Sequence, residues 1–286
     1  RTLHPAHRRR DAKPMADRKI AFVTGASRGI GRAACLALAE CGWDIVATAR
    51  TVREGAAADG RPLSGSIEST ADEVRKRGQQ ALAIPLDLLE PTSIDAATAQ
   101  ALAEWGHVDL LLNNGIYTGP GTMDHVLDLE AEQVQALFQG NLFSQIHLVQ
   151  QLLPSMLKRG TGTVINMVSG SGTSDPPAAA GAGGWGFAYA ASKAAFHRMV
   201  GILAVEHPES GLNFVNLDPG FVMTEAMRLN DPDAAISDHF RPAPPSVPAS
   251  VIAWLADKGG AEQWNGNTVQ AQKVALKLSL HPDWRG

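Results

Sequence analysis

Six short apolar runs recur along the chain, and each is followed by a segment with a helical pattern of hydrophobic positions. The runs are IAFVT, DIVAT, LAIPL, VDLLLN, TVINMV and NFVNL. Strands that alternate with helices in this way are typical of βαβ units, whose parallel strands are joined by right-handed crossovers. Because the runs are apolar throughout, both faces of the sheet should be covered by helices. The sequence therefore predicts an α/β fold built on a doubly wound, mostly parallel sheet of the Rossmann type.

Other parts of the pattern predict long helices, a last strand and loops. Helices are expected over about 130–158 and 187–207, and NGNTVQAQ near the C-terminus predicts a final strand. Stretches rich in Gly, Pro and polar residues predict loops over 53–66, 171–186 and 225–248. Ligands bind beyond the carboxyl ends of the strands in such a sheet, so the last two loops are expected to shape a substrate pocket.

The start of the chain differs from the rest, because it is basic, contains proline and has no amphipathic period. We expect residues 1–18 to form a disordered extension, with translation naturally beginning at Met15; a basic arm that binds an acidic partner is the alternative. We expect residues 19–286 to form a single Rossmann-type domain.

Composition and charge exclude several classes of protein. The 286 residues are 44% hydrophobic and carry a formal net charge of -4, which suits a globular domain and offers no strongly positive field for nucleic acid. No run of about 18 apolar residues predicts a membrane span, and no apolar signal-peptide core lies near the start. Cys35 and Cys41 should lie about 9 Å apart along one helix, too far for a disulfide. We therefore expect a cytoplasmic protein whose partners are neither nucleic acid nor membrane.

The first apolar run leads directly into a glycine-rich segment, TGASRGIG, which contains Gly25, Gly29 and Gly31. A helical pattern, RAACLALAECG, follows it. Glycine lets a backbone approach a phosphate closely, and a helix N-terminus offers unpaired N–H groups and a positive dipole end to an anion. An ordinary strand-to-helix turn is the alternative. The position of the glycine-rich segment between a strand and a helix favours a phosphate-binding turn.

A second motif, Tyr189-Ala-Ala-Ser-Lys193, lies in the helix expected from about residue 187. Positions i and i+4 share one face of a helix, so the phenol and the ammonium should project side by side. A neighbouring ammonium stabilises phenolate and should lower the tyrosine pKa from its usual value of about 10. The pair therefore predicts a tyrosine that acts as general acid and base.

Together, TGASRGIG and the Tyr-x-x-x-Lys pair resemble the short-chain dehydrogenase/reductase family, over about residues 20–224. The resemblance implies an oxidoreductase that interconverts a carbonyl and an alcohol of a small molecule by hydride transfer with a nicotinamide cofactor. It implies that the catalytic residues are Ser169, Tyr189, Lys193 and Asn141. The residues assigned to the cofactor site are Gly25, Ser27, Arg28, Gly29, Ile30, Gly31, Arg50, Asp87, Leu88, Asn113, Tyr189, Lys193, Pro219, Gly220, Val222 and Thr224.

The resemblance also implies a role for each catalytic residue. Ser169 follows TVINMV, where the family has a serine whose hydroxyl bonds the substrate oxygen; because the loop is long, Ser171 and Ser174 are alternatives. Lys193 would hold the nicotinamide ribose as well as act on the tyrosine. Asn141, in QGNLFSQ, matches an asparagine that supports a water and proton relay towards the lysine. Its alternative is a structural hydrogen bond between helices.

Two further motifs match the family with differences. The run Asn113–Ile116 reads NNGI and resembles N-N-A-G without the last glycine, which leaves the loop beneath the nicotinamide in question. Asn113 would take a strand-stabilising or ribose-side role, and Tyr117 either lines the pocket or packs. The run DPGFVMT matches P-G-x-x-x-T. By resemblance, the backbone near Val222 and the hydroxyl of Thr224 contact the nicotinamide carboxamide or the pyrophosphate.

The choice of cofactor depends on the end of the second expected strand, which reads ATAR. An acid at this place would bond the ribose hydroxyls of NAD, whereas this chain has Ala49 and Arg50, with Arg28 nearby in the turn. Two guanidinium groups suit a 2′-phosphate, so NADP(H) is favoured over NAD(H). The alternative is that Arg50 is a solvated loop charge. Asp87, beside Leu88 in the run LDL, resembles the family acid that contacts the adenine, or else it caps a helix or a turn.

The remaining features bear on metals, assembly and substrate. The nine histidines show no zinc-type spacing, so no metal is expected. The two long helices are candidates for a subunit interface in a homo-oligomer, a dimer or a tetramer. Trp185, Met227 and Phe240 lie in the expected loops and do not single out a substrate.

Two alternative functions remain. One is a non-catalytic NADP(H)-binding scaffold, which the complete Ser, Tyr and Lys set disfavours. The other is an epimerase or dehydratase of the extended relatives, which the glycine spacing disfavours.

Overall fold

The computed structural model describes residues 17–55, 63–230, 242–257 and 259–286. Residues 1–16 of the expected extension lie outside the described residues, and so does Phe240 of the expected substrate loops.

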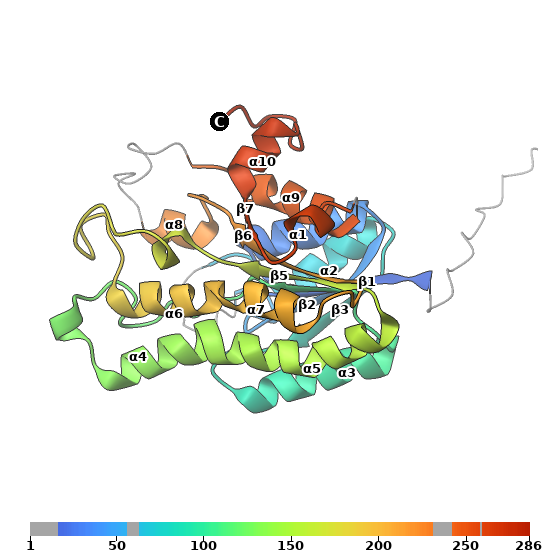
Figure 1. Ribbon diagram of the computed structural model, residues 1–286, viewed down its shortest axis with the longest axis horizontal. Helices are drawn as coiled ribbons and strands as arrows, with labels where there is room; N and C mark the ends of the chain where they lie inside the picture. Colours follow the sequence, from blue (N-terminus) through green and yellow to red (C-terminus); the bar gives the residue numbers. More distant parts are fainter. Residues whose placement is uncertain (1–16, 56–62, 231–241, 258) are drawn as a thin grey trace, which may run out of the picture.

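One sheet of seven parallel strands runs through the centre of the molecule (Figure 1), in the order β3-β2-β1-β4-β5-β6-β7. Each of the six apolar runs forms a strand, and the run near the C-terminus forms the last one. The predicted Rossmann-type sheet is therefore confirmed. The strands are β1 (Lys19–Thr24), β2 (Trp43–Ala49), β3 (Ala81–Pro85), β4 (Leu110–Asn113), β5 (Gly162–Met167), β6 (Leu212–Asp218) and β7 (Thr268–Gln270).

Helices cover both faces of the sheet, as the continuous apolar strands require (Figure 1). On one face lie α1 (Gly29–Glu40), α2 (Ile67–Lys76), α9 (Ser246–Asp257) and α10 (Ala271–Lys277). On the other lie α3 (Pro91–Trp105), α4 (Ala131–Phe138), α5 (Ser144–Arg159), α6 (Phe187–His197) and α7 (Met199–Glu206). Short helical turns complete the described elements: η2 (Val126–Asp128), η3 (Gln139–Phe143), η4 (Gly170–Gly172), α8 (Glu225–Asn230) and η5 (Glu262–Trp264).

Two hydrophobic cores lie on opposite faces of the sheet. Along β1, Ala21 and Val23 belong to the core under α1 and α9, whereas Ile20 and Phe22 belong to the core under α3 and α5. All four side chains are fully buried. Each fully buried apolar side chain of this size is worth roughly 1.5–3 kcal/mol, which explains why no polar alternation remains in the strands.

The two long helices form close to the expected limits, with an interruption in each. The segment expected over 130–158 is α4 and α5 joined by a π-helical turn, η3. The segment expected over 187–207 is α6 followed by α7, with the break at Arg198. Neither interruption was predicted, because both retain the apolar periodicity of a continuous helix.

The prediction of a continuous loop over 225–248 is wrong in part. Residues 225–230 form α8, and α9 begins at Ser246. Thr224 starts α8 by accepting a hydrogen bond from the Met227 amide, at 3.3 Å. Val222, just before α8, forms an isolated bridge with Ala243, just before α9.

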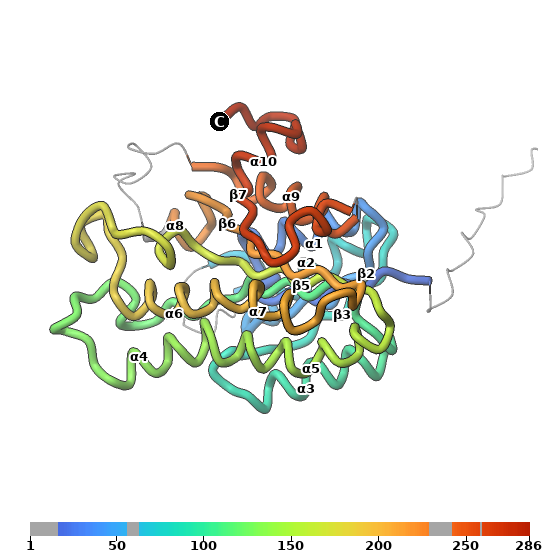
Figure 2. Tube along the Cα trace, in the orientation of Figure 1, coloured from blue at the N-terminus to red at the C-terminus, as the bar shows by residue number. Residues whose placement is uncertain are grey.

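The order of the strands reverses beside β1, because the chain proceeds outwards to β2 and β3 and then returns to β4. Ligands bind at the carboxyl ends of the strands at such a switch point. The loop 171–186, α8 and the start of α4 lie at one end of the molecule (Figure 2). None of the helices in the described part of the chain is long and apolar enough to cross a membrane. Cys35 and Cys41 are both free thiols, as the spacing predicted.

Candidate active site

The glycine-rich turn between β1 and α1 brings strand, turn and helix into direct backbone contact. Gly25 and Gly29 have φ angles of +66° and +56°, in the left-handed region that other residues avoid. A Cβ on Gly31 would lie 2.3 Å from the carbonyl oxygen of Gly25. The turn therefore requires all three glycines, because a side chain at these positions would strain or separate the backbone segments.

Thr24 and Asn114, which the sequence analysis assigned no role, fix this turn to β4. The Thr24 hydroxyl accepts from the amides of Asn114 and Gly115, at 3.0 and 2.8 Å, and donates to Leu112. The Asn114 side chain donates to the Thr24 carbonyl, at 2.9 Å. In the sequence, these two residues are marked only by their positions: Thr24 precedes the first glycine of the turn, and Asn114 is the second asparagine of NNGI. Together they join the turn to the switch point.

The N-terminus of α1 fits an anionic group. Arg28, at the N-cap position, makes no side-chain capping bond, and the first turn contains no acid. The amide of Gly29 donates to a carboxylate oxygen of Glu225, at 2.9 Å. The turn therefore holds one anion already and has the geometry to hold a pyrophosphate. Ser27 is buried beside it and Ile30 is half-buried.

The two arginines assigned to a 2′-phosphate have different surroundings. Arg28 donates to the carbonyls of Ser64 and Gly65, each at 3.0 Å, and to the Thr51 hydroxyl at 3.3 Å. Arg50 is exposed directly after β2. The side chain of Arg28 thus secures the loop before α2, while that of Arg50 extends into solvent beside it.

Asp87 and Leu88 have structural contacts at the end of β3. The Asp87 carboxylate accepts from the Leu89 amide, at 2.9 Å, which is the turn-forming alternative. The side chain of Leu88 packs in the core under α3, and its carbonyl accepts from the Ser144 hydroxyl.

Three hydroxyl groups meet at the carboxyl end of β5. The phenol of Tyr189, on the first turn of α6, lies close enough to the side chains of Ser169 and Ser171 for both to lower its pKa. The two serine oxygens lie 3.0 Å apart. Ser174 is exposed and is not part of this group. The structure therefore brings together Ser169, Tyr189 and one of the two alternative serines.

Burial raises the pKa of Tyr189 above its ordinary value. Hydrogen bonds from Ser169 and Ser171 oppose this increase, and the negative charge of Asp218 adds to it. The expected decrease in the tyrosine pKa is thus reversed in direction, because desolvation outweighs the interactions that stabilise phenolate.

Lys193 lies one helical turn after Tyr189 and is almost entirely buried. Its ammonium donates to the carbonyl of Met167, at 2.9 Å. Burial lowers the pKa of Lys193 from 10.5 to about 7. Burial therefore disfavours the charged ammonium form of Lys193.

The side chain of Asn141 is buried within the π-helical turn η3. Its oxygen accepts from the Tyr117 amide at 2.8 Å, and its nitrogen donates to the Tyr117 carbonyl at 3.2 Å and to the Ser192 hydroxyl at 3.4 Å. The contact with Ser192 on α6 is of the kind expected for the structural alternative to a proton relay. They hold the loop after β4 against α6.

The remaining assigned residues lie at the ends of β4 and β6. Asn113 is buried and donates to Asn166 on β5 at 2.9 Å, which corresponds to its strand-stabilising role. Gln272, a residue the sequence analysis missed, donates to the carbonyls of Pro219 and Phe221 at 3.0 and 2.8 Å. It thereby fixes the segment after β6. The other assigned residues of this segment are Gly220, with a φ of +67°, Val222, which is buried, and Thr224, which packs near Gly29.

No cluster of three or more His, Cys, Asp or Glu side chains that could hold a metal ion occurs among the described residues.

Comparison with known proteins identifies the family. The profile described as short chain dehydrogenase matches residues 19–234. Oxidoreductase UcpA of Salmonella typhimurium is 30% identical over 75% of this chain and 75% of its own length. Ketoacyl reductase HetN of Nostoc is 29% identical over 92% of this chain and 84% of its own. A short-chain type dehydrogenase/reductase from Mycobacterium marinum has a solved structure with a TM-score of 0.74 and 25% identity, covering 88% of this chain and 93% of that one. With these matches, the glycine-rich turn and the Tyr-x-x-x-Lys pair on a Rossmann-type sheet place the chain in the short-chain dehydrogenase family, as an NAD(P)-dependent oxidoreductase.

Proposed function

We propose that the protein reduces a small-molecule carbonyl to an alcohol, with NADP(H) preferred over NAD(H) and Tyr189 as the proton donor. The observation that carries this proposal is the group of hydroxyls formed by Tyr189, Ser169 and Ser171 at the carboxyl end of β5. One domain, from residue 19 onwards, would supply both the cofactor turn and this group.

The chain's own residues account for the proton transfer. The phenol of Tyr189, whose pKa burial raises above its ordinary value of about 10, is protonated at neutral pH and can donate to a carbonyl oxygen. Ser169 would hold that oxygen, and Ser171 orients Ser169 by donating to its hydroxyl at 3.0 Å. Lys193, with a pKa of about 7, can take up and release the proton that restores the phenol. When bound, the nicotinamide cofactor supplies the hydride.

The preference for NADP(H) rests on charge at the end of β2. The strand ends at Ala49 and is followed by the exposed Arg50, where an acid would repel a 2′-phosphate. A guanidinium group bonds a phosphate through two charge-assisted hydrogen bonds. Arg28 contributes positive charge from the turn while its donors hold residues 64 and 65.

The names of the relatives suggest which substrates to test. The relative named ketoacyl reductase supports testing 3-oxoacyl compounds first within a broad panel of carbonyls. Trp185 and Met227, both half-buried in the segments before α6 and within α8, would contact the substrate. The two free thiols are consistent with a reducing compartment such as the cytoplasm.

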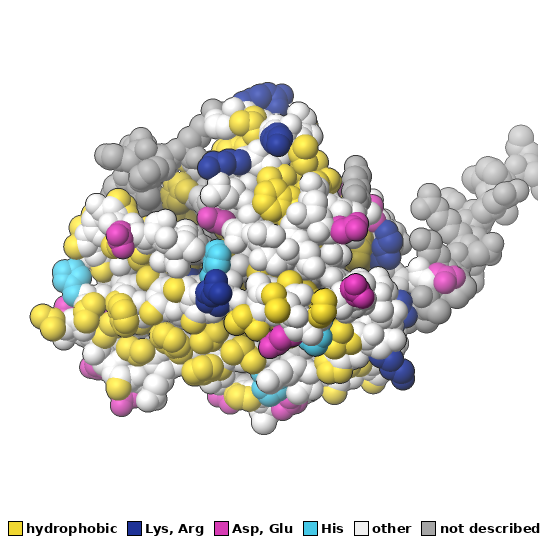
Figure 3. Space-filling view, viewed as in Figure 1, with side chains coloured by type: hydrophobic (Ala, Val, Ile, Leu, Met, Phe, Trp, Pro, Cys, Tyr) yellow, Lys and Arg dark blue, Asp and Glu magenta, His cyan; other side chains and the backbone are white. Residues whose placement is uncertain are grey.

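A homo-oligomer is supported by an apolar face on α5, α6 and α7. Hydrophobic side chains form a band across these helices (Figure 3). Exposed hydrophobic side chains on these helices and at the end of η3 include Phe143, Phe187, Ile202 and Val205, of which Val205 is 79% exposed. Between α5 and α7 the face is hollowed by a groove of about 410 Å³. A contiguous apolar surface of this kind marks an association site, and a second copy would cover it by two-fold symmetry.

The function is tested by NADPH oxidation over the carbonyl panel with wild type and Tyr189→Phe. We expect kcat of the variant to fall about 10²- to 10⁴-fold, because the proton donor is lost, while NADPH binding is retained. The chain contains two tyrosines, so Tyr117→Phe is the matched control and should stay within a few-fold of wild type. Equal activity of all three proteins would refute the role of Tyr189.

The cofactor preference is tested with Arg50→Ala. We expect KM for NADPH to rise at least about tenfold, since the charge-assisted bonds of this guanidinium to the 2′-phosphate are lost, and KM for NADH to stay within about twofold. Arg53→Ala removes a nearby exposed arginine and should alter neither value. Equal changes for both cofactors would show that Arg50 does not read the 2′-phosphate.

Burial of Lys193 should appear in the pH dependence of stability. The unfolded chain keeps the lysine proton up to about pH 10.5 and the folded chain only to about pH 7, so the free energy of unfolding should rise across this interval. In Lys193→Met this rise disappears, and its urea midpoint should exceed that of wild type most near pH 7. Lys158→Met, at an exposed site on α5, is the control. Parallel profiles of wild type and Lys193→Met would contradict the shift.

The association face is tested with Val205→Glu. A buried, unpaired carboxylate is costly, so we expect sedimentation velocity to show a smaller species than wild type. Val126→Glu places the same charge on η2, where Val126 is 63% exposed, and should leave the mass unchanged. A wild type that sediments as a monomer would refute the oligomer.

A further inference from the structure

The carboxylate of Glu225 lies on the turn that we propose binds the cofactor pyrophosphate. Glu225 is the first residue of α8, and its Oε2 accepts from the amide of Gly29 at 2.9 Å. The side chain of Thr224 packs against the same glycine, with its Cγ2 3.3 Å from where a Cβ would lie. The start of α8 therefore packs against the start of α1, although Gly29 and Glu225 lie 196 positions apart in the sequence.

Glu225 supplies the negative charge that the N-terminus of α1 lacks. The N-terminal amides of a helix carry a partial positive charge and lack partners within the helix. Helix α1 has neither a capping side chain nor an acid in its first turn. A carboxylate from elsewhere in the chain therefore stabilises this end of the helix, as a bound anion would.

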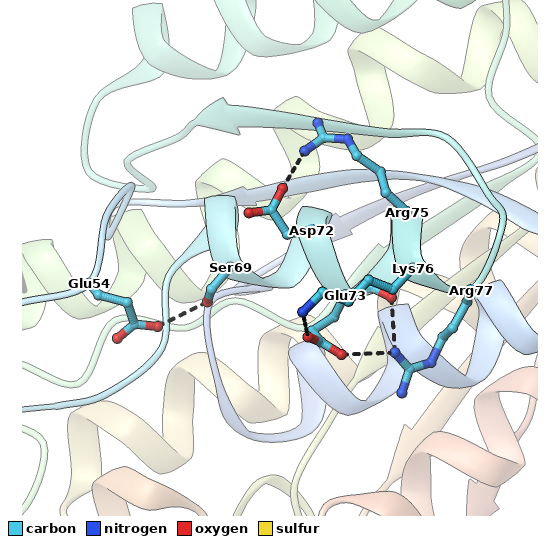
Figure 4. A network of polar contacts seen from close by, with 7 residues as sticks. All are labelled: Glu54, Ser69, Asp72, Glu73, Arg75, Lys76 and Arg77. Carbon is cyan, nitrogen blue, oxygen red and sulfur yellow. Dashed lines mark hydrogen bonds and ion pairs between the residues drawn. The ribbon is translucent and has the colours of Figure 1, made fainter.

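The other acidic residues near the turn bind partners elsewhere. A cavity of about 330 Å³ beside the turn is lined by Arg28, Arg32 and Lys76 and by four acidic residues, one of which is Glu225. The other three, Glu54, Asp72 and Glu73, bond groups on α2, at its C-cap or in the loop before it (Figure 4). Glu225 is thus the acid of this cavity that has its carboxylate on the phosphate-binding turn.

We propose that Glu225 takes the place of the cofactor pyrophosphate in the free protein and that the cofactor must displace it to bind. Two anions cannot share one amide donor, and their mutual repulsion opposes simultaneous occupancy. Release of Glu225 also frees the start of α8 from the turn. Cofactor binding is therefore coupled to the position of α8, next to Met227 of the expected substrate pocket. This inference rests on the proposed function, since it takes the turn to be the pyrophosphate site.

The test compares wild type with Glu225→Gln, which keeps the shape of the side chain and removes its charge. By titration calorimetry, we expect the dissociation constant of NADPH to fall roughly three- to tenfold in the variant, because a weaker competitor occupies the amide. Glu104→Gln removes one negative charge at an exposed site on α3 and should leave the constant unchanged. It controls for the change in net charge.

A second measurement follows the free protein. Without cofactor, Glu225→Gln should melt roughly 1–3 °C below wild type, because α1 loses its anion. With saturating NADPH the two melting temperatures should coincide, since the carboxylate is displaced from both. A dissociation constant that is unchanged or larger in Glu225→Gln would overturn the competition while leaving the proposed function intact. If neither protein binds NADPH or NADH, the proposed function fails, and this inference fails with it.

Discussion

The contact on which the site depends is the one between the backbones of Gly25 and Gly31. A Cβ at Gly31 would lie 2.3 Å from the Gly25 carbonyl oxygen, so any side chain there would force α1 away from the end of β1. Thr24 and Asn114 secure the same contact from β4, through hydrogen bonds of 2.8 to 3.0 Å. The three elements therefore meet at the point where strand order reverses. A ligand at this point reaches the helix N-terminus and the ends of several strands at once.

Burial, more than pairing of charges, determines the pKa shifts of Tyr189 and Lys193. Tyr189 and Lys193 lie on one face of α6, yet the ammonium bonds the carbonyl of Met167, and the phenol lies beside two serines that lower its pKa. Desolvation raises the pKa of the tyrosine and lowers that of the lysine, so both neutral forms are favoured. A neutral phenol suits donation to a carbonyl oxygen. A lysine that titrates near neutrality suits the return of the proton.

The cofactor turn is also connected to the C-terminal third of the chain. Glu225 reaches Gly29 from α8, and Gln272 holds the carbonyls on either side of Gly220. Both contacts cross long distances in sequence, and both end on backbone groups near the expected ligand. The segment after β6 is thus held at two places, by Gln272 on α10 and by the glycine-rich turn.

The sequence by itself determined the sheet, the glycine-rich turn and the Tyr-x-x-x-Lys pair, because apolar periodicity and backbone chemistry are local properties. It could not choose among Ser169, Ser171 and Ser174, since their distances from Tyr189 depend on how η4 folds back onto α6. Nor could it assign α8, whose start depends on the Thr224 cap and on Val222 pairing with Ala243. The direction of the Tyr189 pKa shift was likewise decided by tertiary structure. Desolvation of the phenol depends on every element packed around it, whereas the i, i+4 spacing in the sequence identifies only one neighbour, Lys193.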